Sequence, residues 1–225
     1  MTEESLPDLD FVIELPLFPE IDAELFVVLQ RVSAIEHQLP QIKESERQRL
    51  AESELDGIND EYEYQAISRW IDEFVEETVP RLYRSPLLIE LWAVFESGVT
   101  EIAKYLQKEQ GHLLSINDLR ANNDFDRARK YYQVVLHLPL ITSDQVKERL
   151  DILVLVRHAL AHGNGRIEVI KENSLKKIQT WEKSNGELST DGQYLNFTSA
   201  FIESMADAVK TALEDLIARV KQLAS

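Results

Sequence analysis

The sequence predicts a mainly α-helical protein, an up-and-down helical bundle with a small antiparallel β-hairpin or flap inserted before the C-terminal helix. Apolar residues recur at spacings of three and four along most of the chain, which is the period of a helix buried on one side. Residues 152–156 are apolar in every direction, as is typical of the central helix of a bundle. The 225 residues, 44% of them hydrophobic, suffice for one substantial core. We therefore predict one folding unit with additions.

The first 79 residues are predicted to form an extended arm followed by helices. Residues 1–20 contain three prolines among alternating apolar and acidic residues, which favours an extended arm. Helical periodicity covers residues 21–39, and Pro40 is expected to interrupt or kink its continuation toward residue 55. A second helix is predicted over residues 61–79. The side chains predicted to face inward are Leu25, Val28, Leu29, Val32, Ile35, Tyr64, Ile67, Ile71, Phe74 and Val75.

Residues 80–225 are predicted to form the bundle itself. Ser85 can cap a third helix with Pro86 in its first position, and that helix runs to Gly111. A fourth helix is predicted over residues 124–137, closed by Pro139. The inward stripes of these two helices are Leu88, Leu91, Trp92, Phe95, Val99, Ile102 and Leu106, then Ala128, Tyr131, Val135 and Leu138.

A fifth helix, an insertion and a last helix complete the prediction. The fifth helix begins at Thr142, whose side chain can form a capping box with Gln145, and ends at Gly163. The insertion at residues 166–197 contains short β-like runs separated by turn dipeptides, which predicts a hairpin or three-stranded flap. These runs are residues 167–170, 178–181 and 194–197, and the dipeptides are Asn185-Gly186 and Asp191-Gly192. Residues 199–222 form a last amphipathic helix, with Phe201, Met205, Val209, Leu213, Leu216, Ile217 and Val220 inward.

The formal net charge of −16 is concentrated at the N-terminal end of the chain. Residues 1–79 hold 21 acidic and 5 basic residues, which leaves 19 of each sign for the remainder. This distribution favours a solvated acidic helical layer over residues 21–79, or a face turned away from an anionic ligand. A net negative protein is an unusual partner for nucleic acid, but the neutral remainder leaves that partner open.

Composition also narrows the chemistry and the compartment. The absence of cysteine excludes disulfides, thiolate nucleophiles and cysteine-bound metals, and favours a reducing compartment. The acidic start lacks the basic-then-apolar pattern of an export signal. No apolar run approaches the roughly 20 residues that cross a bilayer. We therefore predict a cytoplasmic protein that does not associate with membranes.

Three polar side chains at the end of the most apolar helix carry the chemical prediction. Arg157, His158 and His162 are costly there unless each finds a partner or water. His158 and His162 share a helical face, whereas Arg157 lies about 140° from His162 on an ideal helix. Those two can converge only through the reach of the guanidinium, through unwinding at Gly163, or across a partner subunit. Histidine can exchange protons and arginine can clamp a phosphate, which suits metal-free cleavage of RNA. A satisfied structural network is the alternative.

Other residues near this segment have weaker functional interpretations. Asn164 and Arg166 follow the helix and are candidate substrate-binding residues. Gly163-Asn164-Gly165 lacks the sequence of a phosphate loop and is interpreted as a helix stop. A zinc pair at His158 and His162 lacks the glutamate of a metalloprotease and a third ligand, so neither a metal nor a cofactor is expected. Further candidates, each with a purely solvated alternative, are Lys171, Lys176 and Lys177 as phosphate contacts and Glu96 as a carboxylate that orients Arg157.

The segment from Arg157 to His162, followed by Gly163, resembles the Arg-polar-x-x-x-His motif of the HEPN superfamily. The resemblance covers this motif closely and the helical layout from residue 82 to 165 loosely. It implies a compact helical bundle, often dimeric, in which paired motifs meet at a cleft. By the same resemblance Arg157 and His162 are catalytic residues, and His158 occupies a position where the family accepts Asn, Asp or His. The acidic helical layer and the insertion depart from the minimal bundle.

The resemblance implies a metal-independent endoribonuclease with a toxin or antiviral role, acting as a homodimer on RNA, with an antitoxin as a possible partner. Some members of the superfamily are inactive scaffolds. The alternative prediction is therefore a non-catalytic protein-interaction module, which docks another protein through the acidic layer or the insertion.

Overall fold

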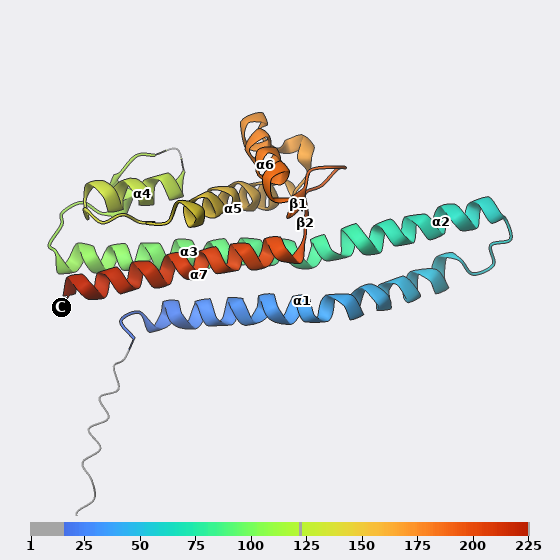
Figure 1. The fold of residues 1–225 in the computed structure, drawn as a ribbon, viewed down its shortest axis with the longest axis horizontal. Coiled ribbons are helices and arrows are strands. Elements are labelled where there is room, and N and C mark those ends of the chain that lie inside the picture. The colour runs from blue at the N-terminus through green and yellow to red at the C-terminus, as the bar shows by residue number, and fades with distance from the viewer. Residues whose placement is uncertain (1–15, 122, 225) are drawn as a thin grey trace, which may run out of the picture.

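The computed structural model describes residues 16–121 and 123–224, and it confirms the mainly α-helical class (Figure 1). Seven α-helices and one two-stranded antiparallel hairpin make up these residues, and the hairpin precedes the last helix as predicted. The helices are α1 (Pro19–Glu54), α2 (Glu61–Glu73), α3 (Val79–Glu109), α4 (Asp124–Val134), α5 (Asp144–Gly163), α6 (Glu172–Asn185) and α7 (Ser199–Ala224). The strands are β1 (Leu188–Ser189) and β2 (Asn196–Phe197). Short helical turns cover Phe74–Thr78, Ile116–Asp118 and Ile167–Val169.

Helices α3 and α7 lie side by side at the centre of the bundle. Helix α1 packs along them on one side, while α5 and α4 cover the other (Figure 1). Every inward residue predicted for α3 and α7 is buried. Gly98 lies where α3 approaches its neighbours closely, because a Cβ there would lie 3.0 Å from Leu213 and 3.3 Å from Ile21. Among the described residues, no helix has the length and apolar content needed to cross a membrane.

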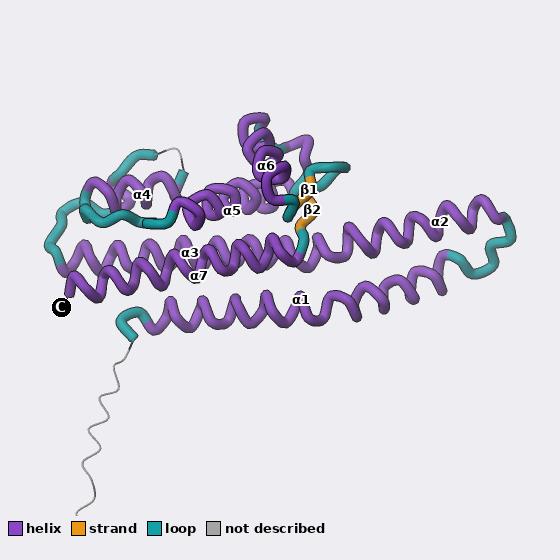
Figure 2. The backbone as a smooth tube through the Cα atoms, in the orientation of Figure 1, coloured by secondary structure: helices purple, strands orange, loops and turns teal. Residues whose placement is uncertain are grey.

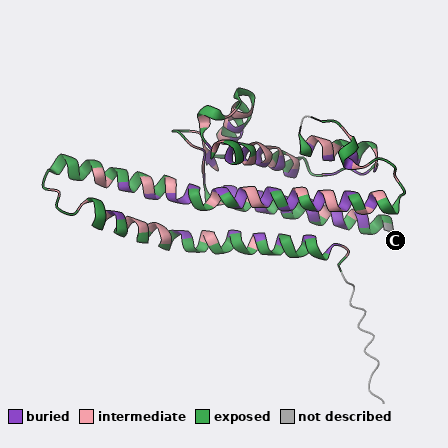
Figure 3. Ribbon diagram, turned by 180° about the vertical axis from the view of Figure 1, so that it is seen from behind, coloured by how far each residue is buried: buried purple, intermediate pink, exposed green. Residues whose placement is uncertain are grey.

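The distal part of α1 and all of α2 leave the bundle as a two-helix arm, which we define as residues 41–78 (Figure 1). Its own small core consists of Leu50, Ile71 and Val75. Twelve acidic and four basic residues lie in the arm. Arg47 bonds both Asp72 and Glu76 across the two helices. Figure 3 shows that exposed residues dominate the arm, whereas buried residues dominate α3.

Helix α1 is continuous where the sequence predicted an interruption or a kink at Pro40. The interruption is wrong, whereas Figure 1 shows that α1 bends along its length. It runs through Pro40 to Glu54, although a proline at that point has no N–H to donate to the carbonyl of Glu36. Leu39 and Leu50, on either side of the proline, are both buried, so packing maintains the helix. The N-terminal segment of residues 1–20, which was predicted to be extended, lies mostly outside the described residues. Pro19 is the first residue of α1.

The predicted start of a separate third helix at Ser85 and Pro86 is wrong. A single helical rod runs from Glu61 to Glu109, with a π-helical turn at Phe74–Thr78. The Ser85 hydroxyl is buried without a hydrogen-bond partner, so it caps nothing. The apolar residues on both sides of Pro86 pack into the same core, which outweighs the one helical hydrogen bond that the proline removes.

The predicted ends of the next two helices need small corrections. Helix α4 stops at Val134 instead of continuing to His137, which has a φ of 49°. The cap of α5 is Ser143, whose hydroxyl accepts from the Val146 amide at 3.4 Å. The predicted capping box of Thr142 is wrong, because that hydroxyl donates to Asp215 on α7 at 2.7 Å.

The insertion before α7 is more helical than predicted (Figure 2). Residues 178–181 lie in α6 and not in a strand, because Ile178 and Trp181 are the buried side of an amphipathic helix. Residues 167–169 form a single 3₁₀ turn. Of the three β-like runs, only the last contributes a strand, as β2, which pairs with β1.

Arg84 on α3 fastens this hairpin to the bundle. Its guanidinium donates two hydrogen bonds, at 2.8 and 2.7 Å, to the carboxylate of Glu36 on α1. The same guanidinium donates to the carbonyl of Phe197 on β2 at 2.6 Å. Both charged side chains are 12% exposed, so this pair holds α1, α3 and β2 together with little contact with water.

Candidate functional site

The chain makes a tight turn where α5 ends, and this turn fixes the geometry of the predicted site. The helix stays regular through Gly163, as predicted, and Asn164 then adopts a left-handed conformation with φ of 51°. Gly165 follows with φ of 75°, and a Cβ there would lie 3.1 Å from Leu160. Because α5 does not unwind before Gly163, unwinding does not bring Arg157 and His162 together.

His158 and His162 form an exposed pair on one face of α5. Their ring centroids lie 4.4 Å apart with the planes tilted by 55°. Both residues are solvent-exposed, and neither ring forms a hydrogen bond with a described residue. The two imidazoles are therefore accessible to a ligand.

Arg157, one residue before the pair, is half-buried, and its guanidinium makes no hydrogen bond or ion pair with any residue that the structure describes. An arginine that stabilises a structural network would normally donate to a carboxylate or a carbonyl. The chain returns after the 3₁₀ turn and places Lys171 in the same neighbourhood, where its charge acts on His158.

The pKa of His158 is lowered from its ordinary value of 6.5. Partial burial of the ring is the largest cause, and the positive charges of His162, Lys171 and Arg157 follow. All the charges that shift this pKa have the same sign. His158 is therefore neutral at pH 7 and able to accept a proton.

We call Arg157, His158, His162 and Lys171 the basic cluster. Within the described part of the chain, none of the four side chains is bonded to a carboxylate. The nearest acidic residues in the sequence bond other partners, since Glu168 lies 3.8 Å from Arg166 and Glu172 lies 2.6 Å from Lys176. Like charges held together without counter-ions favour the binding of an anion.

On the other side of the same turn, two arginines flank one tyrosine. The Arg81 guanidinium lies 4.1 Å from the ring centroid of Tyr194, and that of Arg166 lies 5.9 Å from it. Arg81 also donates to the carbonyl of Asn164 at 3.4 Å. Arg81 is only 7% exposed, and this burial lowers its pKa. Asn164 thus contributes its backbone here, while its side chain remains exposed.

The sequence analysis did not identify Arg81 and Tyr194 as residues near the predicted site. The position of Arg81 in the sequence offered one indication. Arg81 lies seven residues before Leu88, on the apolar stripe of α3, where a cation requires an explanation. Tyr194 left no comparable signal, because its contact depends on how the insertion folds back onto α3.

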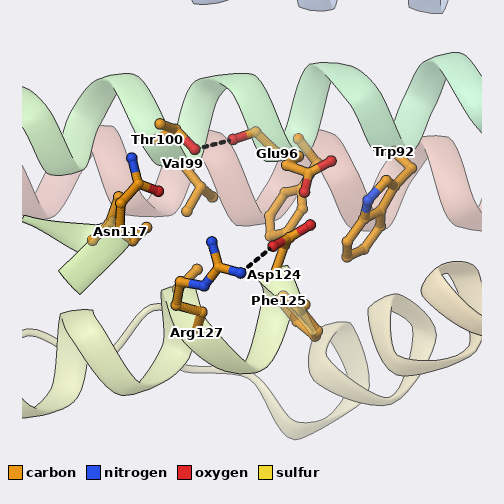
Figure 4. A pocket seen from close by; sticks show the side chains of 11 residues that line it. Trp92, Glu96, Val99, Thr100, Asn117, Asp124, Phe125 and Arg127 are labelled. Carbon is orange, nitrogen blue, oxygen red and sulfur yellow. Dashed lines mark hydrogen bonds and ion pairs between the residues drawn. The ribbon is translucent and has the colours of Figure 1, made fainter. Parts of the chain in front are cut away.

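Three predicted contributors do not join the basic cluster. Lys176 is bonded to Glu172, and both Lys176 and Lys177 line a groove bounded by α4, α5 and α6. Glu96 does not orient Arg157, because it lies in a separate pocket beside Asp124 (Figure 4). As for metals, no three His, Asp or Glu side chains in the described ranges are grouped as an ion would require.

Comparisons of this chain with models of protein families, with curated proteins and with solved structures found no match.

Proposed function

We propose that this chain is a metal-independent endoribonuclease of the HEPN type. The observation that supports the proposal is the basic cluster, in which Arg157 and two accessible imidazoles stand together without a carboxylate partner among the described residues. This is the environment that an RNA phosphate would require.

In the proposed reaction the ribose 2′-oxygen attacks the adjacent phosphorus while the bond from phosphorus to the 5′-oxygen breaks. One imidazole accepts the proton of the 2′-hydroxyl, and a second acid supplies a proton to the leaving 5′-oxygen. The products are a 2′,3′-cyclic phosphate and a free 5′-hydroxyl. Arg157 stabilises the charge that develops on the equatorial phosphate oxygens. We assign proton transfer to His162, with His158 as a neutral neighbour able to accept a proton.

The geometry of this reaction also bears on the proposed homodimer. The attacking and leaving oxygens lie on opposite sides of the phosphorus, so an acid and a base are needed on opposite sides. Two rings 4.4 Å apart on one helix face can serve only one side. A second copy of the basic cluster, from a partner chain, would supply the other.

The first test is cleavage of single-stranded RNA by purified protein in the presence of EDTA. We expect cyclic-phosphate ends, and His162→Ala should reduce the rate at least about a hundredfold if proton transfer is lost. His37→Ala is the matched control, because His37 is an exposed histidine on α1, far from α5 in sequence. Undiminished cleavage by the His162 variant would reject the assignment.

A stability measurement separates this function from a structural role of the motif. Because His162 bonds no described residue, His162→Ala should leave the free energy of unfolding within about 0.5 kcal/mol of the parent. A decrease of about 1 to 3 kcal/mol in the free energy of unfolding would instead indicate that His162 belongs to a structural hydrogen-bond network.

A second candidate function, a protein-interaction module without catalysis, is favoured by the arm. The arm extends beyond the bundle, is strongly acidic and carries Tyr62 at 86% exposure between Glu61 and Glu63. A partner that binds the arm should bind the parent protein in a fixed stoichiometry. The double variant Glu61→Lys, Glu63→Lys should lose this partner, and His162→Ala should retain it. If the parent protein cleaves no RNA but shows this pattern, the interaction function replaces the nuclease.

A further inference from the structure

A pocket between α3, the turn at Ile116–Asp118 and α4 is distinct from the basic cluster (Figure 4). Its volume is about 210 Å³. A protein cavity of about 150 Å³ is sufficient for benzene. The pocket therefore has room for a ring with a short substituent.

Three aromatic side chains form the apolar wall of this pocket. Trp92 packs edge-on against Phe125, with ring centroids 5.3 Å apart, and Phe95 lies 5.5 Å from Trp92 and 5.8 Å from Phe125. All three residues are buried in the main core, so the wall is rigid. An apolar wall of this kind favours a ligand with an aromatic or aliphatic group.

The opposite side of the pocket has an excess of negative charge. Asp124 is bonded to Arg127 at 2.7 Å, and Figure 4 shows the Glu96 carboxylate turned toward Asp124. Glu96 itself forms no hydrogen bond or ion pair through its carboxylate with any described residue. Two carboxylates and one guanidinium leave one negative charge without a partner.

The indole N–H of Trp92 is a second group without a partner. Trp92 is 2% exposed, yet within the described ranges its nitrogen donates no hydrogen bond. Figure 4 shows the nitrogen-bearing edge of the ring turned toward the side of the pocket that holds Glu96 and Asp124. The nitrogen is not sealed from solvent, because the fully buried side-chain atoms without a partner among the described residues are Ser85 Oγ and Trp181 Nε1. The Trp92 N–H therefore lies at the open wall of the pocket, where it reports a ligand that enters.

We propose that this pocket binds a small organic cation, a protonated amine attached to an aromatic or short aliphatic group. The ammonium donates to Glu96 and Asp124, and the apolar group lies against Trp92 and Phe125. An anion of the same shape meets two carboxylates, and a neutral analogue leaves Glu96 unpaired. The ammonium can belong to a free amine or to a lysine side chain, which have this chemistry in common.

The test uses three probes of nearly equal shape, namely benzylamine, benzyl alcohol and benzoate, each titrated into the full chain labelled with nitrogen-15. The indole resonance of Trp92, assigned with a Trp92→Phe variant, reports binding. We expect benzylamine to shift this resonance saturably and at least tenfold more tightly than benzyl alcohol, while benzoate causes no shift. Nα-acetyl-lysine amide is a fourth probe, and tighter binding than benzylamine would identify a lysine side chain as the source.

Glu96→Gln keeps the shape of the side chain and removes its charge, so it should weaken benzylamine binding at least tenfold. Glu109→Gln, an exposed glutamate at the end of the same helix, is the matched control and should have no effect. A thermal melt of each variant confirms that the fold survives. Equal affinity for the amine and the alcohol, or no saturable shift with any probe, overturns the proposal. Cleavage of RNA by the Glu96 variant should equal that of the parent, so this proposal and the proposed nuclease fail independently.

Discussion

At the scale of single residues, the basic cluster is defined by the partners that its members lack. Arg157, His158, His162 and Lys171 carry or can carry positive charge, and no carboxylate of the described residues bonds them. His162 lies in the last turn of α5, where a cation interacts favourably with the negative end of the helix dipole. That interaction explains how the helix tolerates one cation there. It does not explain the unpaired Arg157, which lies five residues earlier on the helix.

The pKa of His158 gives a direct measurement of this arrangement. A proton NMR titration should place its midpoint below 6.5, and Lys171→Gln should raise that midpoint because one of the neighbouring charges is removed. The shift should be partial, since burial of the ring is the largest cause. Lys183→Gln, an exposed lysine on the far end of α6, should have no effect. A midpoint at or above 6.5 in the parent protein would contradict the described environment.

The same lowered pKa has a consequence for stability. Between the folded value and the unfolded value of 6.5, the unfolded chain binds a proton at His158 and the folded chain does not. This residue's contribution to stability is thus fully present above pH 6.5 and is lost as the pH falls through that interval. His158→Gln should remove this part of the pH dependence, which chemical denaturation at a series of pH values can measure.

At this scale the sequence correctly predicted that Arg157, His158 and His162 lie near the end of a helix, because a helix end depends on neighbouring residues. It did not predict the stacking of Arg81 on Tyr194. That contact joins α3 to the insertion across more than a hundred residues, and no local pattern encodes it. For the same reason, the sequence suggested Glu96 as a partner of Arg157, whereas the structure places it in the separate pocket beside Asp124.

At the scale of elements, Pro40 is the clearest case in which packing overrides a local signal. The exposed proline lies inside a helix of 36 residues. It removes one backbone hydrogen bond there and costs about 3 kcal/mol relative to alanine in a helix interior. The buried residues on both sides of it keep the helix continuous.

Pro40→Ala should therefore stabilise the protein, by about 1 to 3 kcal/mol, because the alanine N–H can bond the carbonyl of Glu36. Denaturant-induced unfolding, with the slope checked for constancy, measures this change. Gln38→Ala, an exposed neighbour on the same helix, should alter the free energy of unfolding by no more than about 0.5 kcal/mol. If Pro40→Ala destabilises the protein, the chain at this point is bent and the bend is required by the fold.

The errors in predicting elements have a common cause. Ser85-Pro86 has the composition of a helix start, and residues 178–181 have that of a strand. Both segments are short, and a short apolar run fits a period of two or of 3.6. Contacts with α5 stabilise residues 178–181 as part of helix α6. The core that α3 shares with α7 stabilises α3 as a continuous helix. The long stripes of α3 and α7 left no such ambiguity, so their inward residues were predicted correctly.

At the scale of the whole molecule, the arm and the bundle differ both in charge and in expected stability. The arm holds half of the chain's net negative charge, and it leaves the bundle at the end where α5 terminates (Figure 1). The bundle holds the large core and the basic cluster. For the proposed ribonuclease, an acidic arm at this end would oppose the approach of RNA along the arm and leave the bundle side open to it.

The arm should also open independently of the bundle. Only three residues form its buried core, and its ion pairs are largely exposed, so each contributes at most about 1 kcal/mol. We expect its amides to exchange with deuterium through local opening, at a lower free energy than the amides of α7, whose exchange requires global unfolding.

Two substitutions that shorten a buried side chain test this expectation. Ile71→Ala should accelerate exchange within residues 41–78 and leave the exchange of α7 unchanged, because Ile71 belongs to the core of the arm and not to the main core. Leu213→Ala, which removes a fully buried side chain at the centre of the bundle, should accelerate exchange throughout and lower the free energy of unfolding by about 2 to 5 kcal/mol. Hydrogen exchange followed by mass spectrometry resolves the two regions. If Ile71→Ala accelerates exchange in α7 as much as in α2, then the arm and the bundle unfold as one cooperative unit, and the arm serves as a rigid extension of α3.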